Sequence, residues 1–108
     1  MARKMDEKTY SKYFKAFGDP TRLRILALLV GGERTVNDIV KQVGLSQPTV
    51  SRHLSILREA DIVVDRRDGQ QVFYSLNKIS VESCCSGFCD CLSIPVKPVK
   101  FVAKAKRK

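Results

Sequence analysis

Four cysteines lie within eight residues near one end of this 108-residue chain, at Cys84, Cys85, Cys89 and Cys91. A disulfide framework spaces its cysteines so that each bond joins distant segments, and this cysteine cluster does not. Closely spaced thiols favour thiolate chemistry at a single place. Thiolates bind soft or borderline ions in preference to Mg²⁺ or Ca²⁺.

The residue types alone leave several uses of the cysteine cluster open. Four thiolates can hold Zn²⁺ or Cd²⁺ in a tetrahedron, although the usual C-x-x-C pairing is missing. Neighbouring thiols can also oxidise and act as a redox switch. The last alternative is a set of inert thiols, because free cysteine is often simply a small buried side chain.

Catalysis finds little support in the sequence. His53 is the only histidine, and no motif fixes an acid near it, so a Ser-His-Asp or Cys-His set has little to build on. The chain has no G-x-S-x-G, P-loop or H-E-x-x-H motif. We therefore expect a protein that is not an enzyme, in which His53 is partly buried or contacts a phosphate.

Two successive helix starts are followed by a hairpin signal. Thr35 is the expected N-cap of a helix that Gly44 ends, and Ser46 is the expected N-cap of the next helix. An Asp68-Gly69 pair between two strand-like segments predicts a hairpin turn. A helix pair followed by a hairpin is a winged helix-turn-helix, a mainly α fold with a small β-hairpin.

The surface of this unit carries residue types that read DNA. After Ser46, the residues Val50, Leu54 and Leu57 repeat at helical spacing and should face the core, so that polar and basic side chains face outward. Such side chains reach base edges in a major groove, and arginines on a hairpin suit phosphates or the minor groove. The expected contacts to double-stranded DNA are Ser46, Gln47, Thr49, Ser51, Arg52, His53, Arg66 and Arg67.

Three further helices are expected around this unit. Apolar stripes predict a helix over residues 6–17 and another that starts after the N-cap Asp19. The last helix should begin near 77–80 and pass through or end within the cysteine cluster, because Gly87 weakens its continuation. The buried face of the second helix is predicted to consist of Leu23, Leu26, Ala27 and Val30. The apolar surface of this helix is widened by Ile25, Leu28 and Leu29, which predicts a central position in the fold.

The length and composition of the chain indicate its domain organisation and its cellular location. The chain has room for one domain, which we place at residues 6–92. No apolar run is long enough to span a membrane, and residues 1–7 do not resemble a signal peptide, so we expect a cytoplasmic location. Six of the basic side chains follow Pro95, and without them the net charge of +9 falls to +3. Residues 93–108 are therefore predicted to form a basic, disordered tail.

Two segments carry a resemblance to a known family. The run D-P-T-R-L-R-I-L over residues 19–26 and the run G-L-S-Q-P-T-V-S-R-H-L over residues 44–54, together with the hairpin over 66–74, resemble the ArsR/SmtB metalloregulators. This resemblance covers about residues 6–92. It implies a homodimer whose first and last helices form the interface, bound to an inverted-repeat operator and released by an ion.

The metal sites of that family are only partly represented. Residues 33–39 lack the cysteine pair that many members carry in the third helix, and the Asp and His ligands of the last helix have no clear match. The cysteine cluster is similar to the ending of an arsenical-responsive subgroup. That similarity implies As(III) or Sb(III) bound in a thiolate pyramid by Cys84, Cys85 and Cys91, with Cys89 as a substitute ligand. Soft divalent ions (Cd, Zn, Pb), thiol oxidation, or DNA binding with no effector remain the alternatives.

Overall fold

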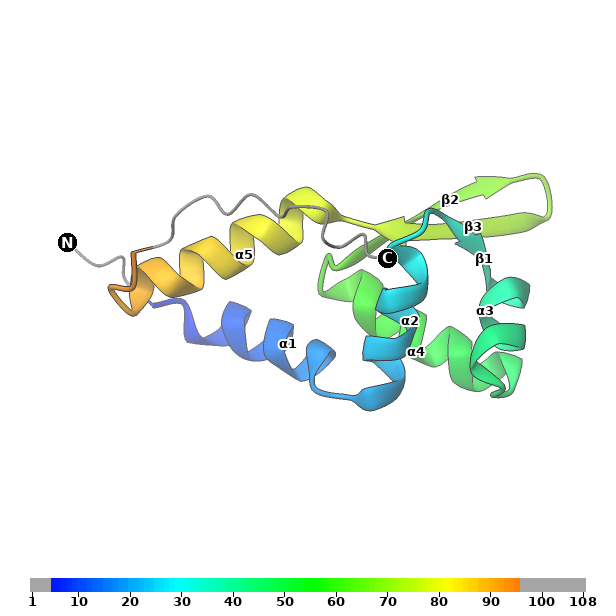
Figure 1. The fold of residues 1–108 in the computed structure, drawn as a ribbon, viewed down its shortest axis with the longest axis horizontal. Helices are drawn as coiled ribbons and strands as arrows, with labels where there is room; N and C mark the ends of the chain where they lie inside the picture. The colour runs from blue at the N-terminus through cyan, green and yellow to red at the C-terminus, as the bar shows by residue number, and fades with distance from the viewer. Residues whose placement is uncertain (1–4, 96–108) are drawn as a thin grey trace, which may run out of the picture.

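The computed structural model describes residues 5–95, which form five helices and a small antiparallel sheet (Figure 1). The helices are α1 (Glu7–Phe17), α2 (Pro20–Leu29), α3 (Val36–Val43), α4 (Gln47–Glu59) and α5 (Lys78–Cys91). The strands are β1 (Arg34–Thr35), β2 (Val63–Asp68) and β3 (Gln71–Leu76). This is the expected winged helix-turn-helix, with α3 and α4 as the helix pair and the β2–β3 hairpin as the wing.

The helices begin where the sequence supplies a short polar cap. Asp19, Thr35 and Ser46 each accept a hydrogen bond from the backbone N–H three residues later, which confirms the predicted starts of α2, α3 and α4. Asp6 and Asn77 cap α1 and α5 in the same way. Each cap fixes the first residue of its helix and therefore the face that every later side chain occupies.

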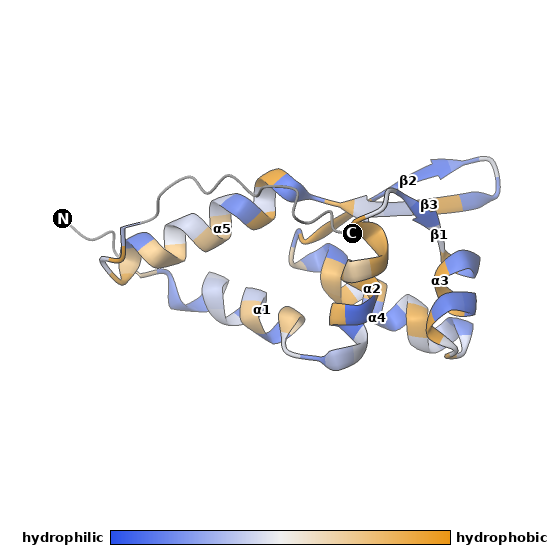
Figure 2. Cartoon of the chain, viewed as in Figure 1, coloured by the Kyte–Doolittle hydropathy of each residue, from blue (hydrophilic) through white to orange (hydrophobic). Residues whose placement is uncertain are grey.

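The core lies where α2, α3 and α4 meet, and Figure 2 shows apolar segments of these helices gathered there. Val50, Leu54 and Leu57 of α4 are each 0% exposed, as their spacing predicts. Burying a side chain of this size contributes about 1.5–3 kcal/mol. The opposite face of α4 is therefore held toward solvent.

The predicted buried face of α2 is only partly correct, since Leu26 packs against the core but the other three predicted residues are exposed. Leu23 and Val30 are 52% and 68% exposed, whereas Ile25 and Leu29 lie in the core at 0% and 2%. The helix has apolar residues on every side, so periodicity does not select one face. Packing against α3, α4 and β3 instead determines which face of α2 is buried. The exposed stripe formed by Leu23 and Val30 is thus available to another surface.

The sheet has one strand more than predicted, in the order β1-β3-β2. The short β1 pairs antiparallel with β3, with Arg34 opposite Tyr74. In the wing, Asp68 pairs with Gln71, so the two turn residues are Gly69 and Gln70 rather than the Asp-Gly pair itself. Gly69 has a φ of +66°, which is a value that two-residue hairpin turns require.

Helices α1 and α5 extend together away from the helix-turn-helix (Figure 1). Phe88 of α5 packs against Tyr10 and Phe14 of α1, with ring centroids 5.4 and 4.7 Å apart. This aromatic packing offsets the roughly 1 kcal/mol that a glycine costs within a helix, and α5 continues through Gly87 to Cys91. The predicted basic tail lies, from residue 96 onward, outside the described residues. Within residues 5–95, no helix is long and apolar enough to cross a membrane.

Candidate DNA interface and cysteine site

The outward face of α4 carries the side chains expected to read bases. Gln47 and Arg52 are exposed, and Thr49 and Ser51 are half-buried on the same helix. Ser46 lies at the helix end, where its hydroxyl accepts from the backbone N–H of Thr49 and donates to the Thr49 hydroxyl at 2.9 Å. The Ser46 side chain is therefore occupied as a cap, and the exposed group closest to it on α4 is Gln47. We call α4 the recognition helix.

His53 faces the protein rather than the open side of the recognition helix. Its side chain is 16% exposed, and its Nδ1 lies 3.1 Å from Nη1 of Arg22 and 3.9 Å from Oδ2 of Asp19. Both partners belong to the start of α2. The structure thus places His53 between helices, which agrees with the partly buried alternative drawn from the sequence.

The two arginines of the wing are in different situations. Arg66 donates to both carboxylate oxygens of Glu33, at 3.0 and 2.6 Å, and its guanidinium lies 4.6 Å from the ring centroid of Phe73. Arg67 is exposed, and within residues 5–95 its side chain has no hydrogen bond or ion pair. Arg67 is therefore available to a phosphate, whereas Arg66 already has an anionic partner in the protein.

The Arg66–Glu33 contact is charge-assisted in both directions. The hydrogen bonds from Arg66 hold the pKa of Glu33 below its ordinary value, and the same contact raises the pKa of Arg66. Because both side chains are largely exposed, the contact adds little to global stability. Its bidentate geometry and the stacking on Phe73 instead fix where the wing lies relative to Glu33, just before β1.

The cysteine cluster occupies the second half of α5. Cys84 and Cys91 are seven residues apart and share one face, but a rise of 1.5 Å per residue separates them by about 10 Å along the axis. Cys85 is turned about 100° from Cys84 and shares its own face with Cys89. A regular helix therefore does not bring the three predicted ligands together. Among residues 5–95, no three His, Cys, Asp or Glu side chains are grouped so that they could hold a metal ion.

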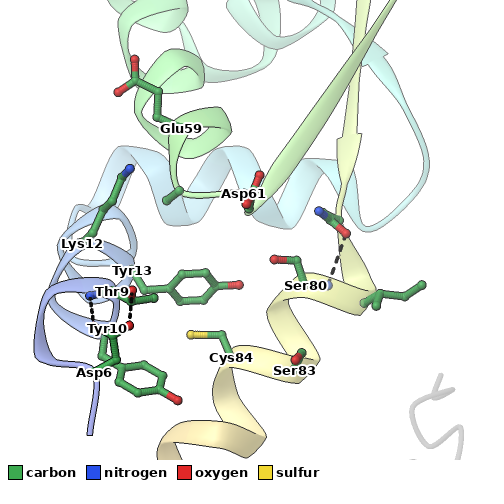
Figure 3. Close-up of a pocket in the computed structure, with 13 residues that line it drawn as sticks. Asp6, Thr9, Tyr10, Lys12, Tyr13, Glu59, Asp61, Ser80, Ser83 and Cys84 are labelled. Carbon is green, nitrogen blue, oxygen red and sulfur yellow. Dashed lines mark hydrogen bonds between the residues drawn. The ribbon is translucent and has the colours of Figure 1, made fainter.

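Cys84 points into a groove between α1 and α5, with a volume of about 880 Å³ (Figure 3). The ring of Tyr13 reaches across this groove toward Ser80, and within the described structure its buried hydroxyl has no hydrogen-bond partner. Burial raises the pKa of the Cys84 thiol, and the neighbouring Cys85 adds to the effect. Burial likewise raises the pKa of Tyr13. The raised pKa favours the protonated form of the Cys84 thiol when no ion is bound.

Two residues that hold predicted DNA contacts in place were not predicted from the sequence. Arg22 and Glu33 lie outside the helix pair and the hairpin, and they contact His53 and Arg66 respectively. The sequence signals for Arg22 are its place in the run D-P-T-R-L-R-I-L and its position at the start of α2, where its guanidinium can reach the last carbonyls of α1. Nothing in the sequence indicates that Glu33 meets Arg66, which is 33 residues away.

Comparisons with known proteins agree with this geometry. The family model described as bacterial regulatory protein, arsR family, matches residues 19–64. The chain is 50% identical over 64 residues to the transcriptional repressor SdpR of Bacillus subtilis, a match that covers 59% of this chain and 71% of SdpR.

Two further relatives are named for metal resistance. The arsenic resistance transcriptional regulator ArsR1 of Pseudomonas putida is 48% identical over 65 residues, covering 59% of this chain and 51% of that protein. The probable mercury resistance operon repressor of Streptomyces lividans is 46% identical over 68 residues, covering 63% and 54%. This chain thus spans about half the length of these two relatives.

The crystal structure of NolR from Sinorhizobium fredii has the same fold, with a TM-score of 0.65 and 33% sequence identity. The match covers 88% of this chain and 100% of the NolR chain. It therefore extends well beyond residues 19–64, the segment that the family model matches.

Proposed function

The chain belongs to the ArsR family of bacterial regulatory proteins, and from this premise we propose a homodimeric repressor that trivalent arsenic or antimony releases from operator DNA. As a member of the family it is a DNA-binding transcriptional repressor and not an enzyme. The effector is the proposed part. The observation that carries it is the position of the cysteine cluster on α5, the helix that packs against α1 through Phe88.

On the DNA side, the recognition helix enters the major groove. Gln47, Thr49, Ser51 and Arg52 would reach base edges, and Arg67 on the wing would contact a phosphate. A two-fold dimer places its recognition helices about 34–36 Å apart, so that both meet successive major grooves on one side of the duplex. Operator binding therefore depends on the spacing that the dimer enforces.

On the ion side, three sulfur ligands must approach one another closely. In the regular α5, Cys91 lies about 10 Å along the axis from Cys84, and Cys85 is turned about 100° from Cys84, so binding must unwind the helix between Gly87 and Cys91. A glycine lowers the cost of such a change because it tolerates a wide range of backbone angles. As(III) and Sb(III) suit a three-thiolate set because they bind sulfur in a pyramid and keep a lone pair on the fourth side.

Unwinding of α5 would couple ion binding to DNA binding. Cys84 and Phe88 face α1, and α1 and α5 are the proposed interface helices, so a change in the end of α5 alters the relation between the two protomers. A coupling of about 1–3 kcal/mol would reduce operator affinity by roughly 5- to 150-fold. Operator DNA must then weaken ion binding by the same factor.

A titration of the protein–DNA complex tests this function. The probe is a duplex that the protein selects from a random-sequence pool, and binding is followed by fluorescence anisotropy. We expect arsenite to release the probe from the wild type, and Ser substitution of Cys84, Cys85 or Cys91 to abolish release while DNA binding is kept. Cys89→Ser is the matched control and should still respond.

Several outcomes would contradict the proposal. Retention of the probe at saturating arsenite, antimonite, cadmium and zinc would reject ion sensing altogether. A response that needs Cys89 but not Cys91 would replace one proposed ligand with the other.

A soft divalent ion is the second candidate effector, because the same thiols could bind it and one relative is named for mercury resistance. Release by Cd²⁺ or Hg²⁺ at lower concentrations than arsenite would favour it.

A further inference from the structure

Arg22 connects three helices through one guanidinium group. Its Nε donates to the carbonyl of Ala16 at 2.7 Å and its Nη2 donates to the carbonyl of Lys15 at 3.1 Å, both in the last turn of α1. Its Nη1 lies 3.1 Å from Nδ1 of His53, in the middle of the recognition helix. The last carbonyls of a helix have no partner within the helix, so Arg22 caps α1 while it contacts α4.

The contact with Arg22 determines which ring nitrogen of His53 accepts a hydrogen bond. Arginine can only donate hydrogen bonds, so Nδ1 of His53 must be the unprotonated acceptor and the ring proton of the neutral side chain lies on Nε2. Asp19, with its Oδ2 at 3.9 Å from Nδ1, is the nearby acid, and it is already engaged by the backbone N–H of Arg22. The acceptor role of Nδ1 is thus satisfied by Arg22.

His53 is adjacent in sequence to Arg52, which faces the proposed DNA surface. Successive side chains on a helix are separated by about 100°, so holding His53 against Arg22 also sets the direction in which Arg52 points. The core residues of α4 are apolar and pack without directional bonds, whereas the Arg22–His53 hydrogen bond has a preferred direction. This bond is therefore suited to fix the rotation of α4 about its own axis.

We propose that His53 is a positioning residue of the recognition helix, which Arg22 locks to the end of α1 and the start of α2, and that His53 does not itself contact DNA. The sequence-based assignment of His53 as a DNA contact would then be replaced by a role within the protein. The proposal concerns DNA binding alone and is independent of the effector.

Two substitutions of His53 distinguish the roles of its two ring nitrogens, Nδ1 and Nε2. The side-chain amide of asparagine places its oxygen near the position of Nδ1, whereas that of glutamine extends to the position of Nε2. If Nδ1 is the functional atom, His53→Asn should restore near wild-type affinity for the selected duplex. His53→Gln should weaken that affinity about tenfold, because the half-buried Arg22 donor loses its acceptor.

The second readout is the affinity for a scrambled duplex of the same length. Non-specific binding rests on phosphate contacts, which a rotated recognition helix retains in large part. We expect His53→Gln to lower specific affinity with little change in scrambled-duplex affinity or in the salt dependence of binding. Arg22→Lys should also lower specific affinity, with an added loss of Tm because the hydrogen bonds to Ala16 and Lys15 are lost as well. Adding His53→Gln to Arg22→Lys should cause little further loss of specific affinity, because the contact with His53 is already absent.

Three outcomes would overturn the proposal. Full affinity in His53→Gln together with loss in His53→Asn would show that Nε2 acts, as a direct DNA contact. Full affinity in both would show that the Arg22–His53 bond is not needed. An equal loss of specific and non-specific binding with a lower Tm in both would show only a contribution to folding.

Discussion

At the scale of single residues, the basic side chains of this repressor serve two purposes. Arg22, Arg24 and Arg34 each donate to a backbone carbonyl near the end of a helix, at Ala16, Val43 and Leu28 respectively. These arginines complement the negative end of the helix dipole. Arg52 and Arg67 are exposed on the recognition helix and the wing. Net charge alone therefore overstates the number of cations available to DNA.

The contact between Glu33 and Arg66 gives a residue-scale prediction on pH. The folded-state pKa of Glu33 is held below its ordinary value, so the contact stabilises the wing at pH values above the unfolded pKa. That stabilisation is lost as the pH falls through the folded-state pKa. Carbon-detected NMR titration of Glu33 should show a depressed pKa in the wild type and an ordinary one in Arg66→Ala.

The matched control for this titration is Arg67→Ala, which removes a neighbouring charge without touching Glu33. It should leave the depressed pKa of Glu33 nearly unchanged. An ordinary pKa in the wild type would mean that Arg66 is released in solution and is available to DNA after all.

The residue types of the site were predictable from the sequence, but their partners were not. A capping Ser46 and an exposed Gln47 follow from local chemistry, which acts over three or four residues. The pairs Arg22–His53 and Arg66–Glu33 join positions 31 and 33 residues apart. Such pairs depend on tertiary packing, so two predicted DNA contacts, His53 and Arg66, proved to have partners inside the protein.

At the scale of helices and strands, the ends of the helices were predicted better than the face of each helix that is buried. Caps and glycines determine where a helix starts and stops, and α3 ends at Gly44 with a φ of +73° as expected. The buried face of α2 was predicted only in part, because both sides of this helix are apolar. The strand β1 was missed because it has only two residues, too few to show any alternation.

Two helices end on a non-glycine residue in the left-handed conformation. Asp61 follows α4 with a φ of +63°, and Ser93 follows α5 with a φ of +59°. Each end has the Schellman pattern, in which the next N–H reaches back five residues: Ile62 donates to the carbonyl of Leu57, and Ile94 to that of Cys89. A side chain in this conformation costs about 1 kcal/mol, which leaves both helix ends strained.

The strain at Ser93 leads to a prediction about the affinity of the protein for arsenite. Ser93→Gly should relieve the strain and stabilise the regular end of α5 by about 1 kcal/mol. Because ion binding is proposed to unwind that end, arsenite affinity should fall by about fivefold. The measurement is isothermal titration calorimetry with arsenite.

The matched control for Ser93→Gly is Asp61→Gly, which makes the same change at the end of α4 and leaves the last turn of α5 intact, although Asp61 lines the same groove as Cys84. It should raise Tm without changing arsenite affinity. Equal arsenite affinity in Ser93→Gly and the wild type would mean that the thiols converge without disturbing the last turn of α5.

At the scale of the whole molecule, one protomer leaves large apolar side chains of α1 and α5 exposed. Phe14 of α1 is 41% exposed, and Ile79 and Leu92 at the two ends of α5 are 81% and 48% exposed. The paired helices α1 and α5 project away from the DNA-reading unit (Figure 1). A second copy that packed on these helices would bury these side chains and set the distance between the two recognition helices.

Ile79→Glu tests this arrangement with little risk to the fold, because the wild-type side chain is almost fully exposed in one protomer. A charge buried in the dimer interface without a partner is strongly unfavourable, so the variant should run as a monomer in size-exclusion chromatography with light scattering. Val64→Glu, at an exposed apolar residue of the wing, should remain a dimer. Losing the second half-site should lower affinity for the full operator by about 10²–10⁴-fold, while affinity for a single half-site is retained. A dimeric Ile79→Glu would place the interface elsewhere, and the route from α5 to DNA would then have to run within one protomer, through α1 and Arg22.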